Sequence, residues 1–148
     1  MAEVVFLSGV PDKLGYAGRL LRKKWREGAR VAVFGSPDLL QRLDQALWTG
    51  NALEFLPHRR WAAGQTLPAG MARTPIWLLE QTQPGLAGRL GCDSAVNLGL
   101  DEVDGLLQFG RVAEIVGDAP ADRAAGRQRW KRYGALGQTP DHRPQGPR

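Results

Sequence analysis

Apolar residues along this chain follow two patterns, short continuous runs and longer stretches with helical spacing. Five runs are apolar at nearly every position: EVVFLSG over residues 3–9, RVAVFG over 30–35, PIWLLE over 75–80, SAVNLG over 94–99 and RVAEIVG over 111–117. A run of this kind is typical of a strand that is covered on both faces of a sheet. We therefore predict about five buried strands.

Helical spacing fills several of the segments between these runs. Segment 13–26 repeats apolar residues every three or four positions and carries basic residues on its other side. Segment 37–48 opens with a proline and follows Ser36, which can cap a helix. A short helix is predicted over 101–109, with Asp101 as its cap. Each of these segments is long enough to connect two strands of a sheet.

Strands that alternate with helices imply right-handed crossovers and a parallel sheet. The predicted fold class is α/β: a three-layer, Rossmann-like, mostly parallel sheet of about five strands with helices on both faces. Residues 1–137 form one such domain, and residues 138–148, which lack apolar periodicity, form a flexible tail. Residues 49–74 leave room for one short extended piece, and residues 81–93 for a short helix or an irregular loop. The direction of the third predicted strand relative to the fourth stays open.

Composition is that of one globular domain. The chain has 148 residues, of which 43% are hydrophobic and 24% charged, so it can bury a core without disulfides. Cys92 is the single cysteine, which excludes an intramolecular disulfide and a cysteine-cluster metal site and fits a reducing compartment. The chain contains no run of about 18 apolar residues and no basic leader at its start. We expect a cytoplasmic protein that makes no membrane contact.

The sequence shows none of the residue arrangements that usually carry catalysis. Residues 8–12, between the first strand and its helix, hold one glycine and a proline, so they form neither a dinucleotide-binding nor a Walker loop. The two histidines are His58, which we interpret as structural, and His142, which lies in the predicted tail. Cys92 has no neighbouring cation to activate it. We predict no catalytic residue, no cofactor and no metal.

Positive charge is concentrated near the C-terminus. The net charge is +5, and segment 121–134 reads ADRAAGRQRWKRYG. In a helix, positions three and four apart share a face, so four residues would lie along one stripe: Arg123, Arg127, Trp130 and Lys131. An indole between cations suits a ligand that is both acidic and apolar, such as a peptide C-terminus, or a nucleic-acid strand. The same pattern also fits a solvated basic helix whose Trp130 packs inward.

Three motifs in order resemble one known family. RLDQALW at 42–48, FLPH at 55–58 and RQRWKRY at 127–133 resemble the chi subunit (HolC family) of bacterial DNA polymerase III holoenzyme, and the resemblance extends over about 3–137. It implies a non-catalytic adaptor with a nucleotide-binding type of fold but no nucleotide site. Such subunits pair with the psi subunit of the clamp loader and bind the acidic C-terminal tail of single-stranded DNA-binding protein. Contact with DNA is then mainly indirect.

The resemblance also implies roles for the residues of the basic stripe. Arg127 would bind the terminal carboxylate of the tail, Trp130 would form the apolar wall, and Arg123 and Lys131 would meet the flanking acidic side chains. The family usually has tyrosine where this chain has Trp130, so a hydroxyl is lost. Matching residues do not place the psi-binding surface, for which an apolar patch within 55–61 is the candidate.

Two other functions stay open on the sequence. The first is direct binding of single-stranded nucleic acid, with Trp130 and Tyr133 stacking on bases and the cations on phosphates. The second is an enzyme acting on a nucleotide, which is motivated by the scaffold type alone.

Overall fold

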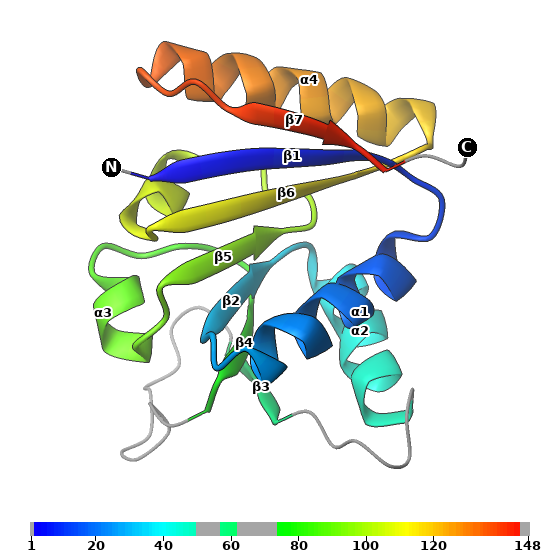
Figure 1. The fold of residues 1–148 in the computed structure, drawn as a ribbon, viewed down its shortest axis with the longest axis vertical. Coiled ribbons are helices and arrows are strands. Elements are labelled where there is room, and N and C mark those ends of the chain that lie inside the picture. The colour runs from blue at the N-terminus through cyan, green and yellow to red at the C-terminus, as the bar shows by residue number, and fades with distance from the viewer. Residues whose placement is uncertain (1, 50–56, 62–73, 146–148) are drawn as a thin grey trace.

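The computed structural model describes residues 2–49, 57–61 and 74–145. Within these residues, seven parallel strands form one open sheet in the order β3-β4-β2-β5-β6-β1-β7 (Figure 1). The strands are β1 (Glu3–Val10), β2 (Val31–Phe34), β3 (His58–Trp61), β4 (Ile76–Leu79), β5 (Ser94–Asn97), β6 (Arg111–Gly117) and β7 (Asp141–Pro144). The helices are α1 (Lys13–Arg26), α2 (Pro37–Thr49), α3 (Leu86–Leu90), the 3-10 helix η2 (Asp104–Gln108) and α4 (Pro120–Ala135).

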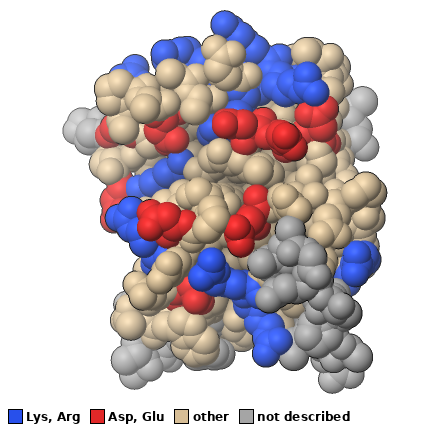
Figure 2. Space-filling view, turned by 180° about the vertical axis from the view of Figure 1, so that it is seen from behind, with Lys and Arg blue, Asp and Glu red and all other residues tan. Residues whose placement is uncertain are grey.

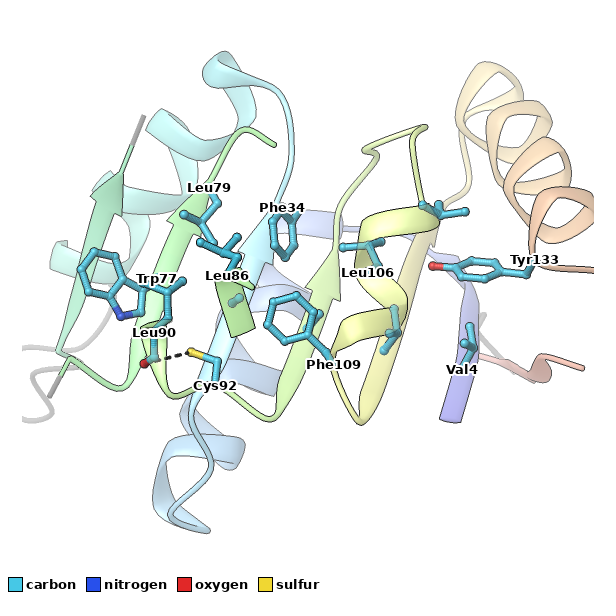
Figure 3. Packing of buried hydrophobic residues seen from close by; sticks show 14 of the residues in the cluster. Val4, Phe34, Trp77, Leu79, Leu86, Leu90, Cys92, Leu106, Phe109 and Tyr133 are labelled. Carbon is cyan, nitrogen blue, oxygen red and sulfur yellow. Dashed lines mark hydrogen bonds between the residues drawn. The ribbon is translucent and has the colours of Figure 1, made fainter. Parts of the chain in front are cut away.

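Helices cover both faces of the sheet, so the predicted three-layer α/β class is confirmed. On one face, apolar residues of α1 and α2 such as Leu21 and Leu43 pack against Val31 and Val33 of β2. On the other face, α3, η2 and α4 contribute to a second apolar cluster. Figure 3 shows this second cluster, with Leu86, Leu106, Phe109 and Tyr133 turned toward the strands. The strands in the middle of the sheet are therefore covered on both faces.

The five predicted strands and the predicted first helix are all present. Helix α1 spans Lys13–Arg26 as predicted, and Asp12 caps it by accepting the backbone N–H of Gly15 at 3.1 Å. Ser36 Oγ likewise accepts the N–H of Leu39 at 3.3 Å at the start of α2. Segment 81–93 contains the short helix α3, and β4 and β5 run in the same direction because both pair parallel with β2.

Two strands are additions to the predicted five. Strand β3 lies at one edge of the sheet, reads HRRW, and falls within segment 49–74, where one short extended piece is predicted. The apolar residues of that segment at 53–56 lie outside the described residues. Strand β7 lies at the other edge and reads DHRP, with every side chain exposed. Neither strand is an apolar run, because an edge strand is stabilised by backbone hydrogen bonds to a single neighbour.

Strand β7 corrects the prediction of a flexible tail over 138–148. Residues 141–144 pair parallel with 5–8 of β1, and the N–H of Gln145 donates to the carbonyl oxygen of Ser8 at 2.6 Å. The segment therefore belongs to the sheet through its backbone, and apolar periodicity gave no sign of it. The sheet therefore extends past residue 137, through β7 at 141–144.

The short helix predicted over 101–109 begins later than expected. Its 3-10 turns span Asp104–Gln108, Val103 precedes them, and no side chain caps them. Asp101, the predicted cap, is exposed, with one carboxylate oxygen 3.9 Å from Nη1 of Arg129. None of the helices in the described part of the chain combines the length and the apolar character needed to cross a bilayer.

Candidate functional site

Helix α4 lies close against the sheet at one glycine. Gly126 is buried, and a Cβ atom added to it would lie 2.9 and 3.0 Å from the two methyl carbons of Val116 on β6. Contacts this short do not occur between real side chains, so only glycine allows the helix to approach β6 this closely. Figure 1 shows α4 along the end of the sheet formed by β1 and β7.

A buried polar network holds the second half of α4 against the sheet. Glu114 of β6 is fully buried and accepts three hydrogen bonds: from Nε of Arg129 at 2.8 Å, from the hydroxyl of Tyr133 at 2.7 Å and from Nδ2 of Asn97 at 2.8 Å. Burial raises the pKa of Glu114, and Arg129 and the other two donors oppose that shift. Burial and the nearby carboxylate also raise the pKa of Tyr133. With Arg129 as its charged partner and three hydrogen bonds in all, the buried side chain of Glu114 fixes the rotation of α4 about its own axis.

That rotation brings three of the four predicted site residues into one cleft. Arg123, Arg127 and Trp130 line a cleft of about 590 Å³ between α4 and the edge of the sheet. The rest of its lining comes from β1, the end of β6, the turn after it, α4 and β7: Phe6, Ser8, Gly9, Val116, Asp118, Gly126 and His142. Residues from both ends of the chain therefore form a single concave surface.

Aromatic rings form the apolar part of this cleft. The ring of Phe6 is 3% exposed, and Trp130 meets it edge to face with centroids 5.1 Å apart. Trp130 nevertheless remains 38% exposed, so its indole is packed on one side and accessible on the other. Neither a fully inward nor a fully solvated Trp130 describes this arrangement. An apolar side chain of a ligand can contact the exposed side of the indole.

The cations of α4 divide into four environments. Arg123 and Arg127 are exposed in the cleft, where Asp118 is the one acidic residue of the described lining. Arg129 is buried on Glu114, and Arg132 forms a salt bridge of 2.6 Å with Asp104. Lys131 is exposed but does not line the cleft. Figure 2 shows Lys and Arg side chains gathered at the end of the molecule where α4 lies.

The chain matches a family model described as DNA polymerase III chi subunit, HolC, over residues 1–141. It belongs to the DNA polymerase III chi subunit family. It is also 34% identical over 134 residues to the DNA polymerase III subunit chi of Pseudomonas aeruginosa (strain PAO1). The aligned region covers 88% of this chain and 86% of that protein. The resemblance seen in the sequence is thereby confirmed, and the family supports an accessory role in DNA replication.

In this chi family member, the motifs RLDQALW and FLPH contact each other. Helix α2 covers the face of the sheet opposite to α4, and β3 lies at the edge opposite to β7. Asp44 of RLDQALW lies on α2, and its carboxylate is 2.7 Å from Nε2 of His58, the last residue of FLPH, on β3. Leu43 and Leu47 of the first motif are buried. These contacts support a mainly structural role. Of the proposed psi-binding patch, Phe55 lies outside the described residues.

Trp61, at the other end of that patch, is not exposed at the surface. Trp61 is 6% exposed, so it belongs to the core and offers little to a partner. A large exposed apolar side chain does lie nearby in sequence, on α2, where Trp48 is 55% exposed and its ring lies 5.1 Å from that of His58. The apolar patch predicted over 55–61 is thus wrong at Trp61.

Several residues that line the cleft between α4 and the edge of the sheet are not predicted from the sequence. Phe6 and Ser8 were assigned to a buried strand, and nothing in the sequence shows which helix lies over which strand. His142 was assigned to a flexible tail, although its ring faces Trp130 with centroids 6.2 Å apart and its Nε2 is 2.5 Å from Oγ of Ser8. Alternation of side chains along the tail is the one signal that could have placed it, and four residues are too few to show it.

Proposed function

We propose that this chi family member is a non-catalytic adaptor of the bacterial cytoplasm, whose cleft between α4, β1 and β7 binds the acidic C-terminal tail of single-stranded DNA-binding protein. The observation that carries the proposal is that Arg123, Arg127 and Trp130 line one cleft whose floor is apolar. A chain terminus that ends in acidic residues, an apolar side chain and a free carboxylate needs these two kinds of contact side by side.

Each part of such a tail has a matching group in the cleft. Arg127 can bind the terminal carboxylate with two parallel N–H donors, which a guanidinium offers in a fixed planar geometry. The last side chain can pack between the exposed side of Trp130 and the floor formed by Phe6 and Val116. A volume of about 590 Å³ is that of a pocket for a small ligand or one large side chain, and not of a groove for a folded partner.

Acidic residues earlier in the tail would meet the remaining cations. Arg123 precedes Arg127 by one helical turn and lines the same cleft. Lys131 lies outside the cleft, so it can attract the tail electrostatically but has no place beside the terminal carboxylate. We therefore reduce the role proposed for Lys131 to long-range attraction, which salt screens strongly.

The geometry favours a peptide over a nucleic-acid strand. Stacking of successive bases needs several exposed aromatic rings along one groove. Tyr133, the second ring of the nucleic-acid hypothesis, is fully buried and donates its hydroxyl to Glu114. Trp130 is left as the single stacking surface on α4. DNA is therefore reached mainly through the partner protein.

Pairing with the psi subunit is the second part of the proposal, and family membership supports it. Strand β3 and helix α2 carry two family motifs and lie at the edge of the sheet opposite to β7. If psi binds at that edge, the cleft beside β7 stays open. One chain can then hold psi and the tail at once, as an adaptor requires.

Calorimetric titration separates the two ligand classes. The purified protein is titrated with a synthetic peptide, a short run of aspartates followed by a terminal phenylalanine, and separately with oligothymidylate. The same peptide with an amidated C-terminus is the matched control, because it lacks only the terminal carboxylate. We expect the free-acid peptide to bind, the amide to bind at least about tenfold more weakly, and the oligonucleotide to bind weakly. Tight oligonucleotide binding beside an inert peptide would overturn the proposal.

A further inference from the structure

Strand β7 brings a histidine into the cleft. His142 pairs in register with Phe6 of β1, so both side chains point to the side of the sheet that carries α4. Nε2 of its ring is 2.5 Å from Oγ of Ser8, and the ring lies edge to face against Trp130 with centroids 6.2 Å apart. The imidazole is exposed and lines the same surface as the two cleft arginines.

The charged groups around this ring come from three elements. Helix α4 contributes Arg123 and Arg127, and the turn after β6 contributes Asp118. On β7 itself, Asp141 and Arg143 flank the histidine and pair with each other at 3.2 Å. The carboxylate of Asp141 accepts the backbone N–H of His142 and not a ring N–H.

Strand β1 offers the ring only the uncharged hydroxyl of Ser8. A protonated imidazole has two N–H donors, and a hydrogen bond to Ser8 uses one of them. The second N–H then remains for a ligand. An acidic ligand brings a carboxylate to which that N–H can donate.

We propose that His142 is a further ligand-contacting residue of the cleft, and that its imidazolium binds a carboxylate of the acidic tail, so that the cleft holds the tail more tightly as pH falls from about 8 to about 6. This inference rests on the proposed function, since it concerns the same ligand. It adds a pH-sensitive contact that arginine and tryptophan cannot supply.

The pH window follows from the chemistry of the lining. Peptide carboxylates titrate near about pH 3.5 to 4, and guanidinium groups stay protonated up to about pH 12, so neither changes charge between about pH 6 and 8. Among the residues that line the cleft, histidine is the one type that gains a proton in that window. A ligand that favours the protonated form binds with net proton uptake, so affinity rises as pH falls. One proton limits the gain to about tenfold for each pH unit.

Calorimetry with the aspartate–phenylalanine peptide at about pH 6, 7 and 8 and constant ionic strength tests this directly. We expect wild type to bind about five- to tenfold more tightly at the lowest pH than at the highest. His142→Gln keeps a polar side chain on the edge strand but cannot become charged, so its affinity should vary less than about twofold over the same range. His142→Lys carries a permanent charge and should show an equally flat profile, tighter than that of the glutamine variant.

The outcomes separate this inference from the function on which it rests. If wild type binds no peptide at any pH, the proposed function itself fails. If wild type binds and His142→Gln retains the full pH dependence, the contact with His142 is wrong while tail binding stands. Weaker binding by His142→Lys than by His142→Gln at every pH would also overturn it. Thermal melts of both variants should match that of wild type, which would show that neither substitution disrupts the fold.

Discussion

Arg127 and Arg129 lie two positions apart on α4 and have opposite environments. Arg127 is exposed and lines the cleft, whereas Arg129 is 1% exposed with Nε 2.8 Å from a carboxylate oxygen of Glu114. A helix turns about 200° between such positions, so one of them can face the sheet while the other faces solvent. The buried pair therefore orients the exposed arginine, and the two kinds of role can be tested separately.

Arg129→Ala should destabilise the fold. The change leaves the buried carboxylate of Glu114 without its charged partner, which costs about 3–5 kcal/mol of unfolding free energy. Urea denaturation measures this loss of unfolding free energy. Arg132→Ala is the matched control, because it removes the same charge from the same helix at an exposed salt bridge with Asp104. Its denaturation midpoint should stay close to that of wild type, and equal midpoints for the two variants would show that the buried pair does not hold α4.

Gly126→Ala should also destabilise the protein, because the new methyl group would meet Val116 at 2.9 to 3.0 Å. Overpacking of this kind costs about 1–3 kcal/mol, and displacement of α4 should weaken peptide binding as well. Gly134→Ala on the same helix meets no atom within 4 Å and should stabilise the fold by about 0.5–1 kcal/mol through helix propensity. If the unfolding free energies of both alanine variants changed in the same direction relative to wild type, the close contact between α4 and β6 would be contradicted.

Cys92 should behave as an unreactive thiol in the folded protein. It is 5% exposed, and burial raises its pKa to about 12, above the ordinary value, so the thiol stays protonated at about pH 8 to 9. Reaction with a disulfide reagent should be slow in native buffer and fast in denaturant. Rapid stoichiometric reaction in native buffer would show that the packing around Cys92, between α3 and β5, is more open than described.

Much of the scaffold could be predicted from the sequence because continuous apolar runs identify central strands. The sequence of 49–74 allowed one short extended piece without placing it, and β7 was not predicted. Backbone hydrogen bonds place both strands at the edges of the sheet, where HRRW and DHRP need no apolar pattern. The burial of single residues in the basic segment 121–134 was harder to predict. Arg129 and Tyr133 belong to the buried face of α4 because Glu114 lies beneath them. Because both side chains carry polar atoms, a pattern based on hydrophobicity does not identify them as buried.

The candidate site was only partly predictable for the same reason. Helical spacing grouped Arg123, Arg127 and Trp130 correctly on one surface of α4. It also included Lys131, which does not line the cleft, because spacing gives no information on where the sheet lies. Phe6 and His142 come from strands at opposite ends of the chain, and only the pairing of β1 with β7 brings them together.

Binding of the free-acid peptide to Arg127→Ala, compared with Arg132→Ala, tests the central claim most directly. The account predicts that Arg127→Ala folds normally and loses about 1.5–3 kcal/mol of binding free energy, roughly a 10- to 150-fold weaker affinity. Arg132→Ala should change affinity by less than about threefold, since both variants lower the net charge equally but only Arg127 lines the cleft. Equal affinities for wild type and Arg127→Ala, measured by calorimetry at low salt, would contradict it.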